Sequence, residues 1–318
     1  MKKSLLAIAV FAAATQVNAA EMYAQDGVTI DISGEVDVQY FKTMAETKDY
    51  STEIKDAQWR VDEANFGFNL GFEMSEDFSM GGHFDIDANN EDDSVTRGDV
   101  YFYVDILDAH VISAGIQPTI LDDAGIGEDY EFGFNAFIEN LDSSGEQVIK
   151  YRYDGGNSFY AGAAYSAYKN ESASTEDDFE LDGNVGVRLG DLEATLFVAM
   201  GEHDSLNANA YIAEVRYVLG EIGIAGTYSY ATTETVSGED SDINAMGLTG
   251  VYRPEGRFEY AVGWAVIDND SNDNGTVNDI YINTSFYFTD AVSAYAELGL
   301  TDEDNTDVGY VIGIAGSF

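Results

Sequence analysis

Cysteine is absent from the 318 residues of this chain, and basic side chains are scarce. Without cysteine, the chain cannot be a small secreted domain held together by disulfides. Only 14 Lys and Arg stand against 59 Asp and Glu, which gives a formal net charge of −45. Nucleic acid is excluded as a partner, because phosphate binding needs a cationic surface. The excess of carboxylates favours cations as partners, or else a solvated, salt-adapted surface.

Long apolar runs are missing after residue 20, so no transmembrane helix is expected there. The first twenty residues contain Lys2 and Lys3, then an apolar run over 5–14, then small residues around Ala19. This is the three-part layout of a secretory signal peptide. The run is too short for a membrane anchor, which needs about 20 residues. We therefore predict a signal peptide over 1–20, cleaved after Ala19 or Ala20, and a single domain over 21–318.

The sequence does contain a regular alternation of apolar and polar residues. Over 28–40, Val28, Ile30 and Ile32 share one phase, while Thr29 and Asp31 share the other. Period-two alternation is typical of a β-strand with one apolar and one polar face. The same pattern predicts sixteen strands, at 28–40, 64–74, 79–88, 99–106, 111–117, 147–154, 158–166, 179–189, 192–200, 211–219, 222–230, 245–253, 257–266, 279–288, 292–300 and 307–318.

The connections between these strands alternate in length. The tight ones are 75–77, 108–110, 154–157, 190–191, 220–221, 254–256 and 289–290. Longer and acidic ones lie at 89–94, 169–178 and 268–275. Short turns at one rim and longer loops at the other are typical of an outer-membrane β-barrel.

The main alternative is a soluble β-sandwich. The face of each strand on which its charged residues lie distinguishes this fold from a membrane barrel. A Lys or Arg on the lipid face of a barrel costs about 2–4 kcal/mol at mid-depth, whereas the outer face of a sandwich tolerates charge. All charges within the predicted strands fall on the polar phase, and the opposite phase is Val, Ile, Leu, Phe, Tyr, Ala and Gly. We predict an all-β fold, a closed 16-stranded antiparallel transmembrane β-barrel, because closure removes strand edges that lipid does not tolerate.

The longest connection, 118–146, is rich in glycine and in acids. Pro118 ends the preceding strand, because proline cannot donate a ladder hydrogen bond. Five acids lie within residues 121–131 of this loop, namely Asp122, Asp123, Glu128, Asp129 and Glu131. Hairpin loops usually have two to five residues, and much longer ones are often functional.

Several stretches together resemble a Gram-negative general porin, in the style of porins from marine gammaproteobacteria. They are the signal peptide, the strand ISGEVDVQY, residues 147–165, the triplet Glu131-Phe132-Gly133, and the final strand GYVIGIAGSF, which ends on Phe318. The resemblance covers the whole mature chain. It implies an outer-membrane barrel that forms a homotrimer among lipid and lipopolysaccharide. It also implies that the barrel-assembly machinery reads Phe318, and that loop 118–146 folds inward as a constriction.

One departure from this family concerns the wall opposite the loop. Family members often carry a cluster of arginines there, whereas the matching inward positions here are mostly acidic. We predict an acidic pore wall that includes Glu35, Asp37, Asp85 and Asp99. The remaining basic candidates for the wall are Arg60, Arg97, Lys150 and Arg152. Because rings of charge set the selectivity of a pore, the sequence predicts a cation-selective diffusion channel for ions and small hydrophilic solutes.

Two other functions stay open on sequence alone. A structural or adhesive barrel would have a closed lumen. An oligosaccharide channel would need a track of lumen aromatics, for which the candidates are Tyr101, Tyr103, Tyr160, Phe197, Tyr281, Tyr287 and Tyr295.

An enzyme is not expected. The three histidines are His83, His110 and His203, and none is predicted on the lipid face, where an outer-membrane phospholipase would need one. No cofactor is expected beyond loose Ca²⁺ or Mg²⁺ on the acidic loops. Residues 270–275 match the start of a calcium loop, but its twelfth position is Tyr281 rather than Glu.

Overall fold

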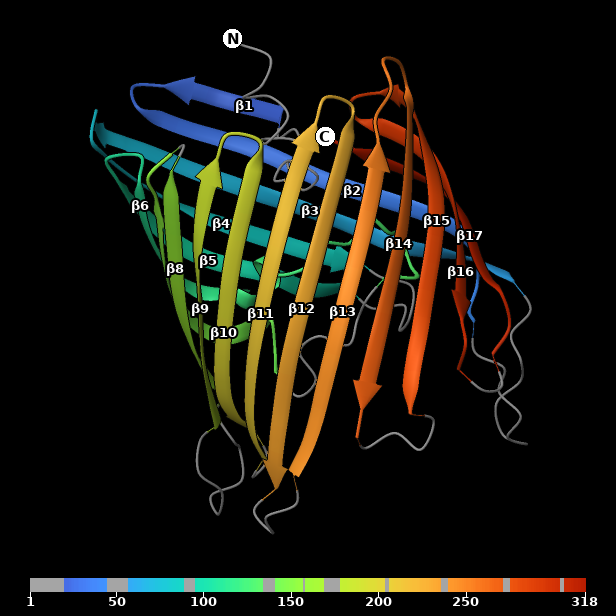
Figure 1. Ribbon diagram of the computed structural model, residues 1–318. Coiled ribbons are helices and arrows are strands. Elements are labelled where there is room, and N and C mark those ends of the chain that lie inside the picture. Colours follow the sequence, from blue (N-terminus) through green and yellow to red (C-terminus); the bar gives the residue numbers. More distant parts are fainter. Residues whose placement is uncertain are drawn as a thin grey trace.

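The computed structural model describes residues 20–44, 57–88, 95–133, 141–156, 158–168, 178–203, 206–235, 240–270, 275–303 and 306–318. Its strands, shown in Figure 1, are β1 Ala20–Gln25, β2 Val28–Lys42, β3 Gln58–Ser75, β4 Phe78–Ala88, β5 Val95–Ile106, β6 His110–Pro118, β7 Ser144–Asp154, β8 Phe159–Tyr168, β9 Asp178–Leu189, β10 Leu192–His203, β11 Leu206–Leu219, β12 Ile222–Thr235, β13 Asp240–Tyr252, β14 Phe258–Asn269, β15 Thr276–Thr289, β16 Val292–Thr301 and β17 Gly309–Ser317. A short 3-10 helix, η1 (Leu121–Asp123), lies between β6 and β7. Within the described ranges, no helix is both long and apolar enough to cross a bilayer. The predicted signal peptide lies outside these ranges, apart from residue 20.

The strands form one antiparallel sheet that closes on itself. Each strand from β2 to β16 pairs with the next, and β17 returns to β2, where Ile314 lies opposite Val38. The closed ring therefore contains sixteen strands, so the predicted fold class and strand count are confirmed. Each strand of this ring has a partner on both sides, as lipid surroundings require.

β1 is an additional strand that the alternation did not predict. It pairs with the first part of β2, where Gln25 lies opposite Val28 and Ala20 opposite Ile32. β17 pairs further along the same edge of β2. Asp26 and Gly27, which join β1 to β2, have positive φ angles of 56° and 76°. Asp-Gly is a favoured pair for two-residue hairpin turns, because both positions need positive φ, and it is the sequence signal for this hairpin.

Burial along the strands is inverted relative to a soluble protein. On β9, Glu180 and Asp182 are 0% and 3% exposed, whereas Leu181 and Val185 are 45% and 49% exposed. The polar phase therefore faces the interior of the barrel and the apolar phase faces outward, as the placement of the charges predicted. A soluble protein buries its apolar phase, so the inversion fits a barrel surrounded by lipid.

Short turns gather at one end of the barrel, at the top of Figure 1. Two residues separate β9 from β10, and two separate β11 from β12. Gly190 and Gly220 in these turns have φ angles of 68° and 64°, a conformation that glycine adopts without strain. The tight connections predicted at 190–191 and 220–221 are therefore confirmed. Most of the longer connections at the opposite rim fall outside the described residues.

One histidine does lie on the outward face. His110 begins β6, opposite the outward-facing Ile106 and beside Tyr153, whose ring centroid is 5.0 Å from that of His110. Its Nδ1 lies 2.8 Å from the hydroxyl of Tyr151. The expectation that no histidine is on the lipid face is therefore wrong. The error arises because the strand begins one residue before the predicted boundary.

Aromatic rings on the inner face lie against glycines of the neighbouring strand. A Cβ added to Gly263 would come within 2.1 Å of the Tyr281 ring, and one added to Gly313 within 2.3 Å of the Tyr295 ring. The missing side chains of these glycines provide the space that the rings occupy.

Replacing Gly313 by alanine is therefore expected to displace the Tyr295 ring. The free energy of unfolding should fall by about 1–3 kcal/mol, the usual cost of overpacking. Urea unfolding in lipid vesicles, followed by tryptophan fluorescence, measures this change. Gly316→Ala on the same strand is the matched control, because an added Cβ there meets nothing closer than 3.9 Å. Equal losses in both variants would contradict the packing argument.

Candidate functional site

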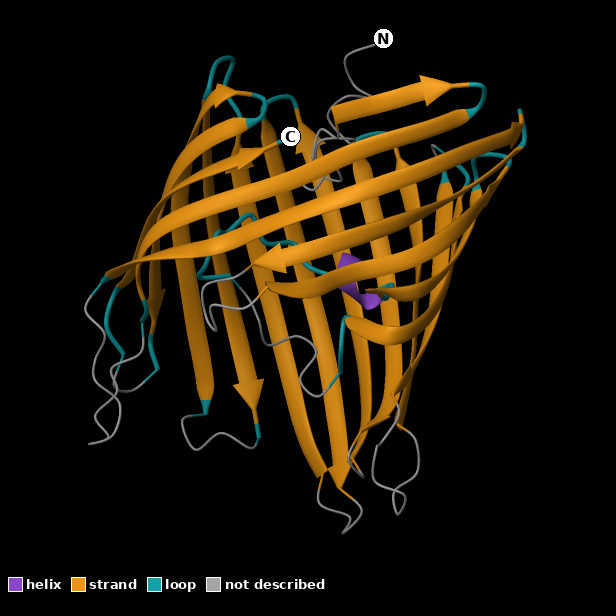
Figure 2. Ribbon diagram, turned by 180° about the vertical axis from the view of Figure 1, so that it is seen from behind, coloured by secondary structure: helices purple, strands orange, loops and turns teal. Residues whose placement is uncertain are grey.

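The connection between β6 and β7 lies against the inner wall, and Figure 2 shows η1 within the ring of strands. At its base, Thr119 N–H donates to the carbonyl of Ser143 (2.8 Å). Ile120 and Leu121 are only 1% and 2% exposed, because they pack on inward-facing residues of β8 to β13. Apolar side chains thus dock the start of the loop onto the wall.

Carboxylates of the wall hold the loop through its backbone. Leu121 N–H donates to Asp182 Oδ1 of β9 (2.8 Å), and Gly125 N–H donates to Glu214 Oε1 of β11 (2.6 Å). Arg216, the next inward residue of β11, donates to the carbonyl of Gly125. Hydrogen bonds with an ionised partner are stronger than neutral ones. The first half of the loop is therefore fixed along β9 to β11.

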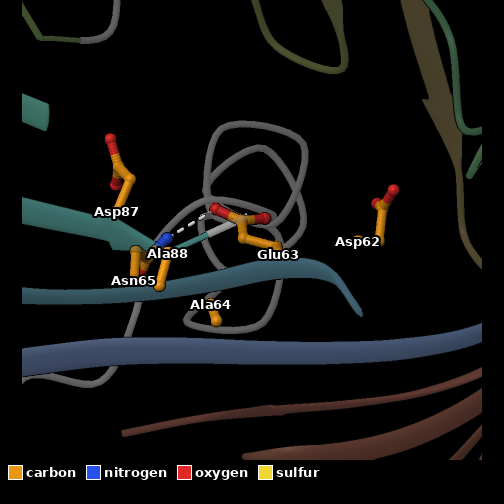
Figure 3. Close-up of a pocket in the computed structure, with 6 residues that line it drawn as sticks. All are labelled: Asp62, Glu63, Ala64, Asn65, Asp87 and Ala88. Carbon is orange, nitrogen blue, oxygen red and sulfur yellow. Dashed lines mark hydrogen bonds between the residues drawn. The ribbon is translucent and has the colours of Figure 1, made fainter. Parts of the chain in front are cut away.

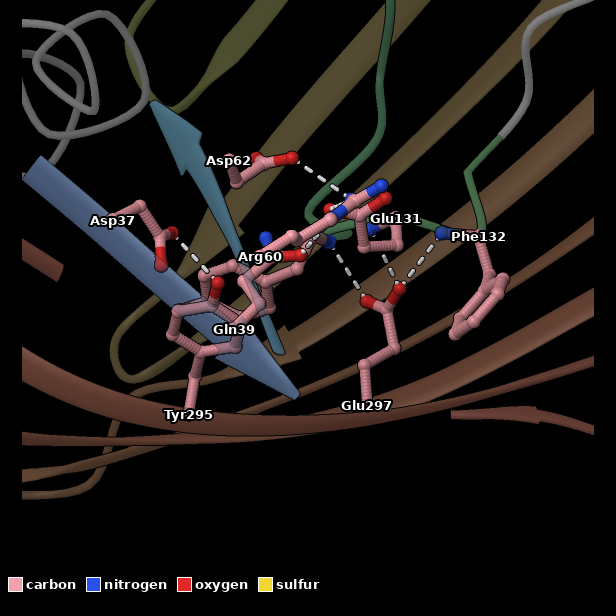
Figure 4. Close-up of polar contacts among 9 residues, drawn as sticks. Asp37, Gln39, Arg60, Asp62, Glu131, Phe132, Tyr295 and Glu297 are labelled. Carbon is pink, nitrogen blue, oxygen red and sulfur yellow. Dashed lines mark hydrogen bonds and ion pairs between the residues drawn. The ribbon is translucent and has the colours of Figure 1, made fainter. Parts of the chain in front are cut away.

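Glu297 of β16 is the centre of a second attachment, shown in Figure 4. Glu297 is only 2% exposed. Oε1 accepts the N–H groups of Glu131 (2.9 Å) and Phe132 (2.8 Å), and Oε2 accepts the N–H of Tyr130 (2.8 Å). The side-chain amide of Asn283 donates to Oε2 as well (2.9 Å). One carboxylate thus holds the tip of the loop through three backbone donors, while the amide of Asn283 on β15 orients that carboxylate.

Aromatic side chains of the inner wall complete the attachment. The hydroxyl of Tyr281 accepts the N–H of Glu128 (2.9 Å), and the Tyr295 ring stacks on Tyr130 with centroids 3.8 Å apart. Phe197 packs in the cluster that buries the start of the loop. These three wall aromatics are 0%, 3% and 2% exposed. They belong to the predicted sugar track, but the loop covers them.

Three of the five predicted loop acids form ion pairs with arginines of the wall. The pairs are Asp123 with Arg152 of β7 (2.7 Å), Glu128 with Arg253 of β13 (2.8 Å), and Glu131 with Arg60 of β3. Sequence reasoning missed Arg253 and Arg216 as contacts of the loop. Alternation shows that both face inward, but it does not show which part of the wall the loop meets. The charge of these three acids is balanced locally.

The other two loop acids contact neutral groups. Asp122 accepts a hydrogen bond from the Ser143 hydroxyl, and Asp129 accepts one from the Gly133 N–H. A Cβ at Gly133 would come within 2.0 Å of the Asp129 carboxylate, so the loop tip is wrapped closely around this side chain. Burial, together with the negative charge of Glu297, raises the pKa of Asp129 to about 6. Asp129 therefore gains its charge as the pH rises through about 6.

A β-bulge increases the charge on the wall that faces the loop tip. In the ladder between β2 and β3, Asp37 lies opposite Glu63, but Val38 lies opposite Val61. Asp62 is therefore an extra residue, and it shifts the inward phase of β3 by one position. The bulge places charged residues in succession at one point of the wall, which strict alternation cannot do.

Arg60 contacts several groups around this bulge (Figure 4). Its Nη2 lies 2.8 Å from Asp62 Oδ1, and its Nε donates to Gln39 Oε1 (2.9 Å). Next to it, Asp37 is 8% exposed and accepts a hydrogen bond from the Tyr295 hydroxyl (2.6 Å). Two predicted wall residues, Arg60 and Asp37, thus lie where the loop tip reaches β2 and β3.

The other predicted wall acids lie on β2, β4 and β5. The backbone N–H of Glu35 donates to Asn65 Oδ1 (2.9 Å). Asp85 lies 3.2 Å from His83 Nε2. Asp99 belongs to a second bulge, where the register between β4 and β5 shifts by one residue. A cavity of about 230 Å³ lies between β3 and β4. Figure 3 shows the residues that line it, which are Asp62, Glu63, Ala64, Asn65, Asp87 and Ala88.

The four predicted basic wall residues have different surroundings. Arg60 and Arg152 pair with loop acids, as described above. Lys150 Nζ donates to the carbonyl of Pro118 (2.6 Å) and so supports the base of the loop. Arg97 lies opposite Ile86, and its half-exposed guanidinium is 3.7 Å from Glu146. Among the described residues, Arg97 makes no ion pair with any of the five predicted loop acids.

Within the part of the chain that the structure describes, no three His, Asp or Glu side chains are placed to hold one metal ion together.

Comparisons with known proteins agree with this architecture. A family model described as Gram-negative porin matches residues 5–306. "Porin-like protein H" of Photobacterium profundum is 30% identical and is matched over 100% of both chains. Among solved structures, a trimer form of OmpT from Vibrio cholerae has a TM-score of 0.77 at 17% identity, covering 92% of this chain and 100% of that one. An anion-selective porin from Comamonas acidovorans has a TM-score of 0.74 at 15% identity, with coverage of 92% and 100%.

Proposed function

The chain belongs to the family of Gram-negative porins, and we propose that this outer-membrane diffusion channel favours cations and is narrowed by loop 118–146. Its solutes are ions and small hydrophilic molecules, and it is a channel rather than an enzyme. The fold does not decide which ions pass, because a porin of the same architecture is described as anion-selective. The preference for cations therefore depends on the side chains that line the passage in this protein.

The single observation that carries the proposal is the position of the loop. Its contacts run from β9 through β11, β13 and β15 to β16, so it covers that part of the inner wall. Apart from Arg60 of β3 and Lys150 and Arg152 of β7, which also contact the loop, the inner wall of β2 to β7 is left for the passage. On these strands the carboxylates include Glu35, Glu63, Asp85, Asp87 and Asp99, and the inward-facing basic side chains include Arg60, His83, Lys150 and Arg152.

The expected Coulomb energies are large enough for these wall acids to affect which ions pass. Two unit charges about 4 Å apart interact by about 1 kcal/mol in bulk water, and by about 4 kcal/mol at an effective dielectric of 20. Carboxylates within about 8 Å of one another in physiological salt add their potentials. The combined electrostatic energy of a cation beside several wall acids therefore exceeds thermal energy. The loop acids contribute less than the sequence indicated, because arginines balance three of them.

Reversal potentials in a salt gradient test the proposal. Purified protein in a planar bilayer with unequal KCl concentrations should give a potential of the sign set by K⁺. A potential of the opposite sign would contradict cation preference. Absence of conductance would contradict an open channel and support the closed structural or adhesive barrel.

Liposome swelling with sugars of graded size separates the general channel from an oligosaccharide-specific one. We expect the rate to depend on size alone, because the loop covers Phe197, Tyr281 and Tyr295 and so interrupts the aromatic track. Saturation by one sugar would contradict a general channel.

The proposed partners follow from membership of the family. We propose a homotrimer, which the trimer form among the structural neighbours supports. Lipid and lipopolysaccharide would surround it, with loose Ca²⁺ or Mg²⁺ on the acidic loops. Removal of residues 1–20 as a signal peptide, and recognition of Phe318 by the barrel-assembly machinery, complete the proposed route to the membrane.

A further inference from the structure

His83 lies in the middle of the acidic wall, on the inner face of β4. In the ladder it is opposite Asn69 of β3 on one side and Tyr101 of β5 on the other. Its ring is stacked on that of Tyr101, with centroids 5.1 Å apart and planes inclined by 29°. Stacking fixes the orientation of the imidazole, so the groups that its two nitrogens face are well defined.

Both ring nitrogens of His83 face oxygen acceptors. Nδ1 lies 2.7 Å from Asn69 Oδ1, and Nε2 lies 3.2 Å from Asp85 Oδ2. A neutral imidazole has one N–H, whereas an imidazolium has two. In the charged form both nitrogens can therefore donate to these oxygens. In the neutral form one of the two nitrogens has no proton and cannot donate to its oxygen partner.

The charged groups around His83 are almost all acidic. Asp85 is on the same strand, and its side chain lies over Gly67 of β3, where an added Cβ would come within 2.2 Å of Asp85 Oδ1. Asp99 is the next inward residue beyond Tyr101 on β5, and Asp31 of β2 is opposite Asn69. Lys150 of β7 is the nearest base beyond β5 in strand order. The charge of His83 therefore acts directly on Asp85 and its neighbours.

We propose that His83 sets the cation preference of the channel according to pH, through its contact with Asp85. This inference rests on the proposed cation channel and adds a residue and a mechanism to it. As the pH falls, the imidazolium balances Asp85 and the wall loses one effective negative charge. As the pH rises, the ring becomes neutral, Asp85 acts on passing ions, and cation preference increases. Histidine is the side chain that ordinarily changes its charge near neutral pH.

Asp129 of the loop changes the same property in the same direction, because its pKa is about 6. An experiment must therefore separate the two groups. The ratio of K⁺ to Cl⁻ permeability is measured from reversal potentials between pH 5 and 8. The variants are His83→Asn, His83→Lys, Asp129→Asn and His83→Asn with Asp129→Asn. His110→Asn, on the outward face, is the matched control.

In the wild type, the permeability ratio should rise with pH by about two- to fivefold, the effect of one charge at about 4–8 Å in an aqueous pore. His83→Asn should retain only the step that Asp129 contributes, and the variant that combines His83→Asn with Asp129→Asn should keep the high ratio at low pH. His83→Lys should have a lower ratio than the wild type at high pH. Asp129→Asn should retain the His83 step, and His110→Asn should behave as the wild type. Titration of the His83 imidazole by NMR in detergent micelles should give the same midpoint.

A pH profile that survives His83→Asn but disappears in Asp129→Asn would overturn the role of His83. So would a His83→Lys variant with the wild-type profile. These outcomes leave cation preference itself intact. In contrast, a wild type without ion preference at any pH would contradict the proposed function, and the NMR midpoint would still report on the ion pair with Asp85.

Discussion

Replacing Glu297 by leucine is expected to release the loop tip from the barrel wall. The N–H groups of Tyr130, Glu131 and Phe132 and the amide of Asn283 would lose their common acceptor. Unsatisfied buried donors cost about 1–3 kcal/mol each. With partial rescue by water, the attachment should weaken by about 3–5 kcal/mol in total. Single-channel recordings should then show a lower mean current with flicker between levels, because the released tip moves into the passage.

Two controls separate this effect from a general loss of structure. Glu297→Gln keeps an oxygen acceptor but loses the charge, so its flicker should be weaker than that of Glu297→Leu. Glu193→Gln removes an inward-facing carboxylate that accepts from Tyr160 rather than from the loop. It should conduct as the wild type. Gel mobility of the unheated protein reports whether each barrel is folded. A folded Glu297→Leu channel with wild-type current would show that Glu297 does not position the loop.

Neutralising the wall acids is expected to give the largest change in ion preference. In the triple variant Glu63→Gln, Asp85→Asn and Asp99→Asn, three negative charges leave the part of the wall that the loop does not cover. Each is worth about two- to fivefold at 4–8 Å in water, so the K⁺ to Cl⁻ permeability ratio should fall by about tenfold or more. Reversal potentials at neutral pH and moderate salt measure the ratio.

The matched control removes the same charge elsewhere. Glu76, Asp191 and Glu221 lie in the tight turns, and their triple replacement by Gln, Asn and Gln changes the net charge equally. We expect little change in ion preference, because screening limits distant charges. An equal fall in both variants would mean that the overall charge, not the β2–β5 wall, sets the preference. The paired loop acids are less suitable targets, because their removal leaves Arg60, Arg152 and Arg253 unbalanced.

The loop itself shows how far local sequence reasoning reaches. Its length, its acids and Pro118 identified it as the longest connection, and the structure places it against the inner wall. Its partners were not predictable. Asp182, Glu214 and Glu297 are 61, 89 and 167 residues from their loop partners in the sequence, and nothing local distinguishes them from other inward-facing acids.

The sequence by itself determined the strands, their two faces and the direction of each charge, because a strand repeats every two residues and lipid excludes charge from one side. It therefore predicted the sixteen-stranded ring, its tight turns and its acidic interior. Only the tertiary structure decided which inward groups meet. Closure of the barrel lets the loop tip contact both Glu297 of β16 and Arg60 of β3. A one-residue bulge at Asp62 changes the phase of β3. Such contacts depend on register and on strand stagger, which alternation alone does not specify. The arginine partners of the loop acids, and the two acceptors around His83, could therefore be found only in three dimensions.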